Sequence, residues 1–354
     1  MNKLSSYIGI NVIGAILLVL FLIVGLDVVS AIIDQLDDLR DGYTFWQSLI
    51  YVGLTIPGRI NEYIPLSALV GCLVAMGMLS SSSEITVIRA SGVSMSRLVW
   101  MAMKPTLWLI LISVLISEYV SPYTDQWAKS HKDFLRSGVN HSLVSGAGLW
   151  HREGDTFMHF NVVQPGGVLY GVTTFEFDSQ GELLSSTFAK RASYQQNDWL
   201  MEGVSRSIFY ADSIENREFT TLKWQTRLSP KMLGYLSLAA EDLSPTGLYD
   251  YAKYLEQQEL DSGAYRLAFW QKCLHPLMIM SLVLVALSFI FGPLRSSTMG
   301  YRVFVGVVVG IAFQFTQNLL GPSSLIYGFS PFYAVLLPIL ICAIVGSTLL
   351  YRTR

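Results

Sequence analysis

Thr156-Phe-Met-His-Phe-Asn-Val162 places apolar side chains at alternate positions, and four more stretches in the middle of the chain do the same. These stretches are residues 168–177, 183–194, 199–209 and 219–224. Turn-forming residues separate them, namely Pro165-Gly-Gly167, Asp178-Ser-Gln-Gly181 and Gln196-Asn-Asp198. Alternation bounded by turn residues indicates antiparallel strands, and a close series of such strands is typical of a small sandwich or jelly roll. The middle of the chain therefore predicts an all-β domain.

The chain on both sides of this block is far more apolar. Of its 354 residues, 52% are hydrophobic and 14% are charged, whereas a soluble domain carries about 25% charged residues. Long apolar runs occupy residues 8–33, 63–83 and 98–119 before the block, and residues 273–293, 303–320 and 331–351 after it. Their lengths match the roughly 20 residues that cross a bilayer. The sequence predicts an α-helical membrane protein with six spans, three on each side of the β domain.

The lengths of the apolar runs and the breaks within them set the bounds of the expected helices. Residues 8–33, interrupted only by Asp27, exceed the apolar region of about 7–15 residues in a cleavable signal, so we expect a retained helix. Residues 45–57 are an apolar lead-in to the second run, either interfacial or continuous with it. Residues 303–351 contain no Asp, Glu, Lys or Arg and are too long for one helix. Gly321-Pro322, followed by Gly328 and Pro331, predicts the break.

Positive charges gather on one side of this six-helix plan. They are Lys3, Arg89, Arg97, Arg295, Arg302, Arg352 and Arg354. The opposite short connection carries Asp34, Asp37, Asp38 and Asp41 against the single cation Arg40. Because cytoplasmic loops are enriched in Lys and Arg, we expect both termini in the cytoplasm and the β domain in the periplasm of a bacterium.

The expected parts of the chain follow from these patterns. Residues 1–121 hold the first three spans, with a cytoplasmic helix at about residues 80–96. Residues 122–265 hold the β domain between helical linkers, and one linker begins at Ser244-Pro245. That helix places Leu248, Tyr251, Ala252 and Leu255 on one face. Residues 266–354 hold the last three spans.

Several classes of function are disfavoured. A net charge of -2 argues against nucleic acid as a partner. The three cysteines, Cys72, Cys273 and Cys342, lie in apolar runs and suggest neither disulfides nor a metal site. The sequence contains no Gly-x-x-x-x-Gly-Lys-Ser/Thr motif, and Ser205 and Ser207 lie in no nucleophile elbow. We therefore expect a non-catalytic chain without a bound metal or cofactor, whose transport energy comes from a partner or an ion gradient.

The connection between the second and third spans is the sharpest candidate for a functional segment. In Ser80-Ser-Ser-Ser-Glu84 the serines suit a helix start, and Glu84 falls in the first turn, where the helix dipole favours a negative charge. Ile85, Val87 and Ile88 then give a short cytoplasmic helix apolar residues that suit docking into a partner. An interfacial helix lying on the lipid is an equally good interpretation.

Polar residues inside the spans are the second candidate. Gln314, Gln317 and Asn318 occur at membrane depth and are expected to face protein or a wet cavity. Gly306 and Gly310 form a small-x-x-x-small pattern that permits close helix contact. Asp27 is a further polar group in the first span. Hydrogen bonding between helices without any substrate explains these residues equally well.

At this point three stretches carry a family resemblance. They are Met78-Leu79 through Ser83-Glu84 to Ala90-Ser-Gly92, Leu287-Ser-Phe-Ile-Phe-Gly-Pro-Leu-Arg295 with Met299-Gly300, and Gly321-Pro322. Together with the layout of three spans, β domain and three spans, they resemble the LptF/LptG permease family of the lipopolysaccharide exporter. The likeness covers essentially the whole chain and is greater to the LptG members than to the LptF members.

The resemblance implies partners and a function. It implies an ATP-driven ABC exporter in the inner membrane of a Gram-negative bacterium, which extracts lipopolysaccharide and passes it to a periplasmic bridge of β-jellyrolls. The chain would form a heterodimer with an LptF-like permease, bind two LptB-like ATPase subunits that carry ATP and Mg²⁺, and associate with an LptC-like bitopic protein. The inward face of the β domain would shelter acyl chains, and a strand edge would pair with the next bridge domain.

The resemblance also implies site residues. The coupling carboxylate would be Glu84, followed by Arg89, Ala90, Ser91 and Gly92. Spans one and five would line the central cavity and its lateral gates. The implied cavity residues are Leu18, Leu22, Asp27, Ile33, Arg40, Arg59, Tyr63, Gly306, Gly310, Phe313, Gln314, Gln317 and Asn318.

One departure and two rival functions stay open. Some relatives carry basic residues at the outer end of span one, whereas this chain reads Asp34-Gln-Leu-Asp-Asp-Leu-Arg40, so Arg59 or the partner subunit would supply positive charge for lipid A phosphates. An ATPase-coupled sensor or mechanotransmitter would use the same coupling helix without an apolar path. An ion-coupled secondary transporter would need buried ionisable groups, for which Asp27 is the sole basis.

Overall fold

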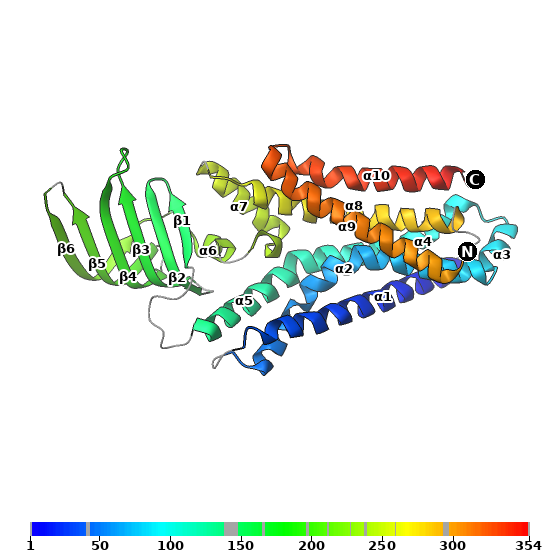
Figure 1. Ribbon diagram of the computed structural model, residues 1–354, viewed down its shortest axis with the longest axis horizontal. Coiled ribbons are helices and arrows are strands. Elements are labelled where there is room, and N and C mark those ends of the chain that lie inside the picture. Colours follow the sequence, from blue (N-terminus) through cyan, green and yellow to red (C-terminus); the bar gives the residue numbers. More distant parts are fainter. Residues whose placement is uncertain are drawn as a thin grey trace.

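The computed structural model describes residues 2–39, 43–137, 148–164, 167–195, 198–210, 212–226, 228–236, 239–258, 260–292 and 297–352. It is elongated, with a helical bundle at one end and a β-sheet at the other (Figure 1). Both chain ends and the short helix α3 lie at the end of the bundle farthest from the sheet, which we call the α3 end (Figure 1). The opposite end is the sheet end.

Six helices of the described chain are long and apolar enough to cross a membrane. They are α1 (Asn2–Leu36), α2 (Phe45–Ser81), α4 (Met95–Leu115) with its extension, α8 (Gly263–Phe291), α9 (Met299–Tyr327) and α10 (Pro331–Arg352). The extension of α4 is a π-helical turn, η1 (Ile116–Val120), followed by α5 (Ser121–Ser137). The predicted class, with three spans on each side of an inserted β domain, is confirmed.

Two helix boundaries test the predictions about the second and fifth spans. The apolar lead-in is continuous with the second span, because α2 runs unbroken from Phe45 through two internal prolines. Of the predicted break signals, Gly328 and Pro331 are confirmed, since Gly328 ends α9 with a φ of +71° and Pro331 begins α10. Gly321-Pro322 does not break the helix, because α9 continues through it to Tyr327. The hydroxyls of Ser323 and Ser324, just after the proline, donate to the backbone carbonyls of Leu319 and Gly321, just before it. Such bonds let a membrane helix tolerate proline.

Six strands form one antiparallel sheet in the order β1-β2-β3-β4-β5-β6. They are β1 (Leu149–Glu153), β2 (Thr156–Gln164), β3 (Val168–Phe177), β4 (Leu183–Gln195), β5 (Asp198–Phe209) and β6 (Ile214–Trp224). All five predicted strands are present, and β1 was missed because it is short. Each strand pairs with the next, so the described strands form an up-and-down meander in one sheet.

A line of interrupted pairing crosses this sheet. The ladders on both sides of β3 skip Gly171, and those on both sides of β5 skip Gly203. Both glycines have a φ of +62°, and a Cβ atom at residue 171 would lie 2.2 Å from the side-chain nitrogen of Asn161. The interruption shifts the inward positions, so that Leu169 and Val172 are both fully buried in the same core.

Short helices join the sheet to the bundle. They are α6 (Pro230–Leu236), η2 (Ala240–Asp242) and α7 (Pro245–Gln257). Ser244 caps α7 by accepting a hydrogen bond from the backbone N–H of Gly247. The predicted apolar face of α7 is confirmed, with Leu248, Tyr251, Ala252 and Leu255 all buried. In the sheet, the indole N–H of Trp199 donates to the carbonyl of Leu228 at 2.7 Å and closes the core from the side of α6.

The bundle is organised around α2, the most buried of the six spans. Helices α1, α8 and α9 all pack against α2, and α10 packs against α8 and α9. Helices α1 and α9 are the least buried spans, so each presents a broad apolar face away from the protein.

Candidate functional site

The predicted coupling segment contains a short helix, α3 (Glu84–Ala90), reached from α2 by a tight turn. Ser83, the residue before α3, has a φ of 65° and a ψ of 5°, a left-handed conformation that non-glycine residues rarely adopt. Its side chain makes no capping hydrogen bond. The predicted serine cap is therefore wrong. The turn is closed instead by backbone hydrogen bonds, among them the one from the N–H of Ser83 to the carbonyl of Ser80.

Glu84 is held by two donors. The hydroxyl of Ser82 donates to Oε1 at 2.9 Å, and the hydroxyl of Tyr7 donates to Oε2 at 3.0 Å. Tyr7 lies near the start of α1, so the predicted coupling carboxylate is joined to a predicted gate helix. Sequence reasoning missed Tyr7, because nothing in the sequence pairs one tyrosine with a carboxylate far along the chain.

The remaining predicted coupling residues lie together at the tip of the bundle. Arg89, Ala90, Ser91 and Gly92 are all exposed, and Gly92 closes the tip with a φ of +90°. Ile85 anchors α3 in the core, whereas the side chain of Val87 is 68% exposed. The tip therefore offers a charged and apolar surface of a kind that suits a protein partner. Its docking stays a prediction.

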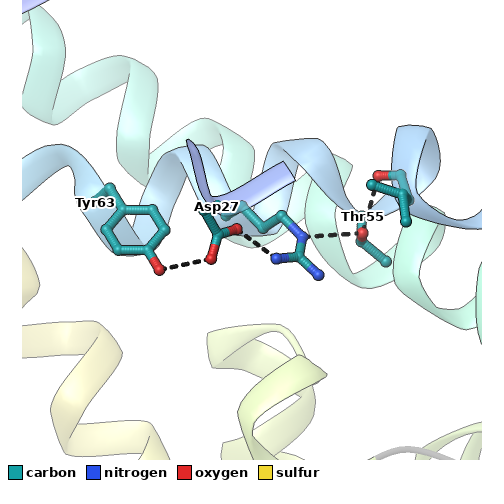
Figure 2. A network of polar contacts seen from close by, with 5 residues as sticks. Asp27, Thr55 and Tyr63 are labelled. Atoms are coloured by element: carbon teal, nitrogen blue, oxygen red, sulfur yellow. Dashed lines mark hydrogen bonds and ion pairs between the residues drawn. The ribbon is translucent and has the colours of Figure 1, made fainter. Parts of the chain in front are cut away.

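The predicted residues of α1 divide into an exposed set and a bonded one. Leu18, Leu22 and Ile33 are exposed on the outer face of the helix. Asp27 instead belongs to a polar network with α2, which Figure 2 shows. Arg59 forms an ion pair with Asp27.

Three further contacts complete this network around Asp27. The hydroxyl of Tyr63 donates to Oδ1 of Asp27 at 2.8 Å, and Nε of Arg59 donates to Oγ1 of Thr55 at 3.2 Å (Figure 2). The Asp27 and Arg59 side chains are 22% and 25% exposed, so the ion pair is largely buried. The structure thus brings Asp27, Arg59 and Tyr63 together as predicted site residues. It gives them a local role in joining α1 to α2.

The predicted residues of α9 lie on two adjacent sides of the helix. Gly306 and Gly310 are buried against α2, where Cβ atoms would meet leucine side chains at 2.2 and 2.3 Å. Phe313 is buried as well. Gln317 is buried, and its amide nitrogen donates to the carbonyl of Val335 on α10 at 3.1 Å. Gly306, Gly310 and Gln317 therefore pack helices together.

A cavity of about 620 Å³ lies between α2, α8, α9 and α10 towards the sheet end. Its wall on α9 includes five of the predicted residues, Gly310, Phe313, Gln314, Gln317 and Asn318. Polar residues also enter from α2 and α8, namely Asn61, Glu62, Gln271, Lys272 and His275. No residue of α1 lines this cavity, so within this chain the two predicted walls do not meet.

The remaining predictions concern Arg40 and metal binding. Arg40 lies outside the described residues. Among the described part of the chain, no three histidines, cysteines or carboxylates gather in a way that would hold a metal ion. His275 lies instead 3.3 Å from the hydroxyl of Ser113, and His151 lies 3.1 Å from the hydroxyl of Tyr254.

Comparisons with known proteins cover the whole chain. The family described as lipopolysaccharide export system permease LptF/LptG matches residues 6–352. A protein of Haemophilus influenzae named lipopolysaccharide export system permease protein LptG is 33% identical over 356 residues, which are 100% of this chain and 99% of that protein. The protein of the same name from Escherichia coli is 33% identical over 339 residues, 95% of this chain and 94% of that protein. The chain belongs to the LptF/LptG family of lipopolysaccharide export system permeases.

Proposed function

We propose that this chain is the LptG-type permease subunit of an ATP-driven ABC exporter that extracts lipopolysaccharide from the inner membrane. Family membership and the six spans support an inner-membrane transporter. The observation that carries the finer proposal is the pair of apolar faces on α1 and α9. These helices both pack on α2 and are the least buried of the six.

A lipid with several acyl chains needs a cavity that opens sideways to the bilayer. In a heterodimer with a related permease, the exposed faces of α1 and α9 would become the walls of such a cavity. Leu18 and Leu22 then contribute apolar surface from α1, while Gln314 and Asn318 contribute hydrogen-bonding groups from α9. The lipid would be held by packing of its acyl chains against apolar side chains rather than by covalent chemistry, since lipid tails and leucine side chains are similarly apolar.

The energy for expulsion would come from a separate ATPase, two copies of which dock at the α3 end. The exposed tip formed by Arg89 to Gly92 and the apolar side chain of Val87 support this proposal. ATP and Mg²⁺ would be bound by that partner. Both termini and α3 would then be cytoplasmic, and the sheet would be periplasmic.

The sheet would receive the lipid as it leaves the membrane and pass it to a bridge of similar domains, to which an LptC-like protein would also belong. Two edge strands, β1 and β6, bound the described sheet. An edge strand presents unpaired backbone groups that suit the addition of a strand from another chain.

The positive charge for the lipid A phosphates is not concentrated on span one. Arg59 is engaged by Asp27, which lowers its availability for a phosphate. A local clamp predicts that Arg40→Ala and Arg59→Ala reduce export to different extents. Export equal to that of the unmodified chain in both variants would instead assign the phosphate contacts to the partner subunit.

The two alternatives have less support. A sensor or mechanotransmitter would use the same coupling helix but would need no apolar path through the spans. In an ion-coupled transporter, Asp27 would have to change its protonation during transport, yet it is bonded to Arg59 and Tyr63.

The test is purification of the tagged chain from its native membrane, followed by reconstitution. Recovery of one related permease, two copies of an ATPase and lipopolysaccharide, with ATP-dependent release of that lipid from proteoliposomes, is the expected result. Recovery of a complex that hydrolyses ATP without releasing lipid would favour the mechanotransmitter. Lipid transport driven by a proton gradient in the absence of any ATPase would favour the secondary transporter.

A further inference from the structure

The two gate helices of the proposed exporter are each bonded to the segment that carries α3. On one side, the hydroxyl of Tyr7 on α1 donates to Oε2 of Glu84 at 3.0 Å. On the other, Nη1 of Arg302 on α9 donates to the carbonyl oxygen of Gly77 in the last turns of α2, also at 3.0 Å. Both contacts lie at the α3 end, several turns from the cavity.

The Tyr7 contact is exposed and can exchange. Glu84 is a charged acceptor whose other oxygen is already bonded by Ser82, so the position of α3 sets where Oε2 points. The side chain of Tyr7 is 46% exposed, and water can replace its hydroxyl when α3 moves. This bond is therefore suited to being made and broken during a cycle.

The hydrogen bond from Arg302 to the Gly77 carbonyl is buried, so breaking it would leave polar groups unpaired away from water. Arg302 is only 4% exposed, and an arginine withdrawn from water must keep its hydrogen bonds. Gly77 permits the close approach, because a Cβ atom there would lie 3.2 Å from Sδ of Met299 and 3.3 Å from Nη1 of Arg302. The start of α9 is thus expected to move with the end of α2.

We infer that Tyr7 and Arg302 are the positioning residues that transmit movement of α3 to the two gate helices. Arg302 makes α9 follow α2 throughout the cycle. Tyr7 connects α1 to α3 in one state and releases it in the other. This inference rests on the proposed function and adds to it the specific contacts that carry the movement.

Helix α1 has a close contact with α2 about which it can pivot when Tyr7 moves with α3. Close to its middle, α1 meets Gly71 of α2 at Ile16, where the backbones touch. Tyr7 lies on one side of that point and Asp27 on the other, at about 14 Å and about 17 Å along the helix. Asp27 is bonded to Arg59 and Tyr63 of α2, so a displacement at Tyr7 about this point acts against those contacts.

The first test compares Tyr7→Phe with Tyr119→Phe in the complete reconstituted complex. Tyr119 is an exposed tyrosine at the sheet end and is the matched control. We expect Tyr7→Phe to lower the amount of lipid released per ATP hydrolysed by about twofold to threefold, the effect of losing a hydrogen bond that water can partly replace. Tyr119→Phe should keep the ratio of the unmodified complex, as should Tyr7→Phe if its role is only to stabilise the fold.

The second test follows each gate helix separately by electron spin resonance. In a background without native cysteines, spin labels at Leu22→Cys on α1 and Phe315→Cys on α9 are each paired with one at Leu340→Cys on α10. All three positions are exposed. Nucleotide should shift both distances in the unmodified complex, and Tyr7→Phe should abolish the α1 shift while leaving the α9 shift.

Arg302 is tested through its neighbour, because removal of a buried arginine risks loss of folding. Gly77→Ala places a methyl group 3.3 Å from Nη1 of Arg302, so the guanidinium must shift by a few tenths of an ångström beside its acceptor while the charge is kept. This variant should reduce the α9 shift and leave the α1 shift. Persistence of both shifts in Tyr7→Phe and Gly77→Ala would overturn the inference. Absence of nucleotide-dependent lipid release in the unmodified complex would instead refute the proposed function.

Discussion

A Cβ atom on Gly71 would lie 2.5 Å from the Cα atom of Ile16, so α1 and α2 cross in backbone contact. Real Cβ atoms do not approach other heavy atoms this closely, and backbone atoms have no alternative rotamer to adopt. The contact lies in the main core of the bundle, between residues that are fully buried around it. It fixes the position of α1, a helix that is otherwise among the least buried.

Gly71→Ala is therefore expected to separate α1 from α2 and to lower the free energy of unfolding by about 1–3 kcal/mol, as overpacking of a core does. Gly310→Ala is the matched control, because its nearest neighbour is the flexible Cδ1 of Leu66 at 2.3 Å. That leucine can rotate, so a smaller loss is expected. Thermal unfolding of both purified variants in the same detergent measures the difference. Equal losses would contradict the backbone contact.

Sequence reasoning found Gly306 and Gly310 and missed Gly71 for a physical reason. A spacing of four residues on one helix is visible in the sequence, whereas the residue that Gly71 meets lies on another helix. The same limit applies to Asp27 and to Tyr7, whose partners Arg59 and Glu84 are distant in the chain. Polar groups in spans can be recognised from composition, but their partners depend on how the helices cross.

The strands and spans were predictable because their signals are local. Alternation placed all five strands from β2 to β6, and charge-free length placed six spans. The end of α9 was placed too early because Pro322 is a local break signal, which the hydroxyls of Ser323 and Ser324 help to overcome. Only the α9 side of the cavity between α2, α8, α9 and α10 was predictable from the sequence. Gln314 and Asn318 are polar residues within an apolar span, and such residues indicate a cavity or a protein contact.

Variants of the Asp27–Arg59 ion pair can show whether these residues stabilise the fold or act on the transported molecule. Asp27→Leu leaves Arg59 without its ion-pair partner, and we expect a loss of about 1–3 kcal/mol in unfolding free energy. The double variant Asp27→Leu/Arg59→Leu removes both charges and should regain most of that stability, since an apolar pair suits this environment. Thermal unfolding of the two variants in one detergent measures the recovery.

Transport by the same variants separates the two roles of Arg59. If the pair only joins α1 to α2, the double variant recovers export together with stability. A double variant that is stable but inactive would show that Arg59, Asp27 or both act on the transported molecule. Asp27→Asn adds a third readout, because retained transport in that variant excludes a protonation cycle at this position.

His151 supports a prediction about pH. Its imidazole is 6% exposed and stacks on the ring of Tyr254, with 6.0 Å between centroids. Burial lowers the pKa of His151 below its ordinary value of 6.5, and the nearby Glu153 opposes that shift less strongly. The folded sheet domain therefore prefers the neutral imidazole, while the unfolded chain takes up a proton near pH 6.5.

Stability from His151 is accordingly complete above pH 6.5 and decreases as the pH falls below that value towards the folded pKa. The decrease has a limiting slope of about 1.4 kcal/mol per pH unit. Thermal unfolding of the sheet domain within the full chain, followed by near-ultraviolet circular dichroism at pH 7.5 and 5.5, measures it. His151→Gln should have a smaller loss between these two conditions. An identical loss in both proteins would assign the pH dependence to other groups.

Ser83 supports a prediction about the turn that presents α3. Its φ of 65° lies in the left-handed region, which costs a non-glycine residue roughly 1–2 kcal/mol. Ser83→Gly should relieve this cost and protect the amides of α3 from hydrogen exchange. Ser83→Val should do the opposite, because a β-branched side chain fits this conformation worst.

Ser94 provides the control for Ser83, since it is another exposed serine in the same connection but has an extended backbone with a φ of −68° and a ψ of 153°. Valine suits extended backbone, so Ser94→Val should change exchange in α3 little. Hydrogen-exchange mass spectrometry of residues 82–93 compares the three variants directly. Equal effects of Ser83→Val and Ser94→Val would rule out strain at Ser83. Faster exchange in Ser83→Val than in Ser94→Val would show that the turn before α3 has a backbone conformation that serine disfavours. Such a turn lowers the cost of moving α3.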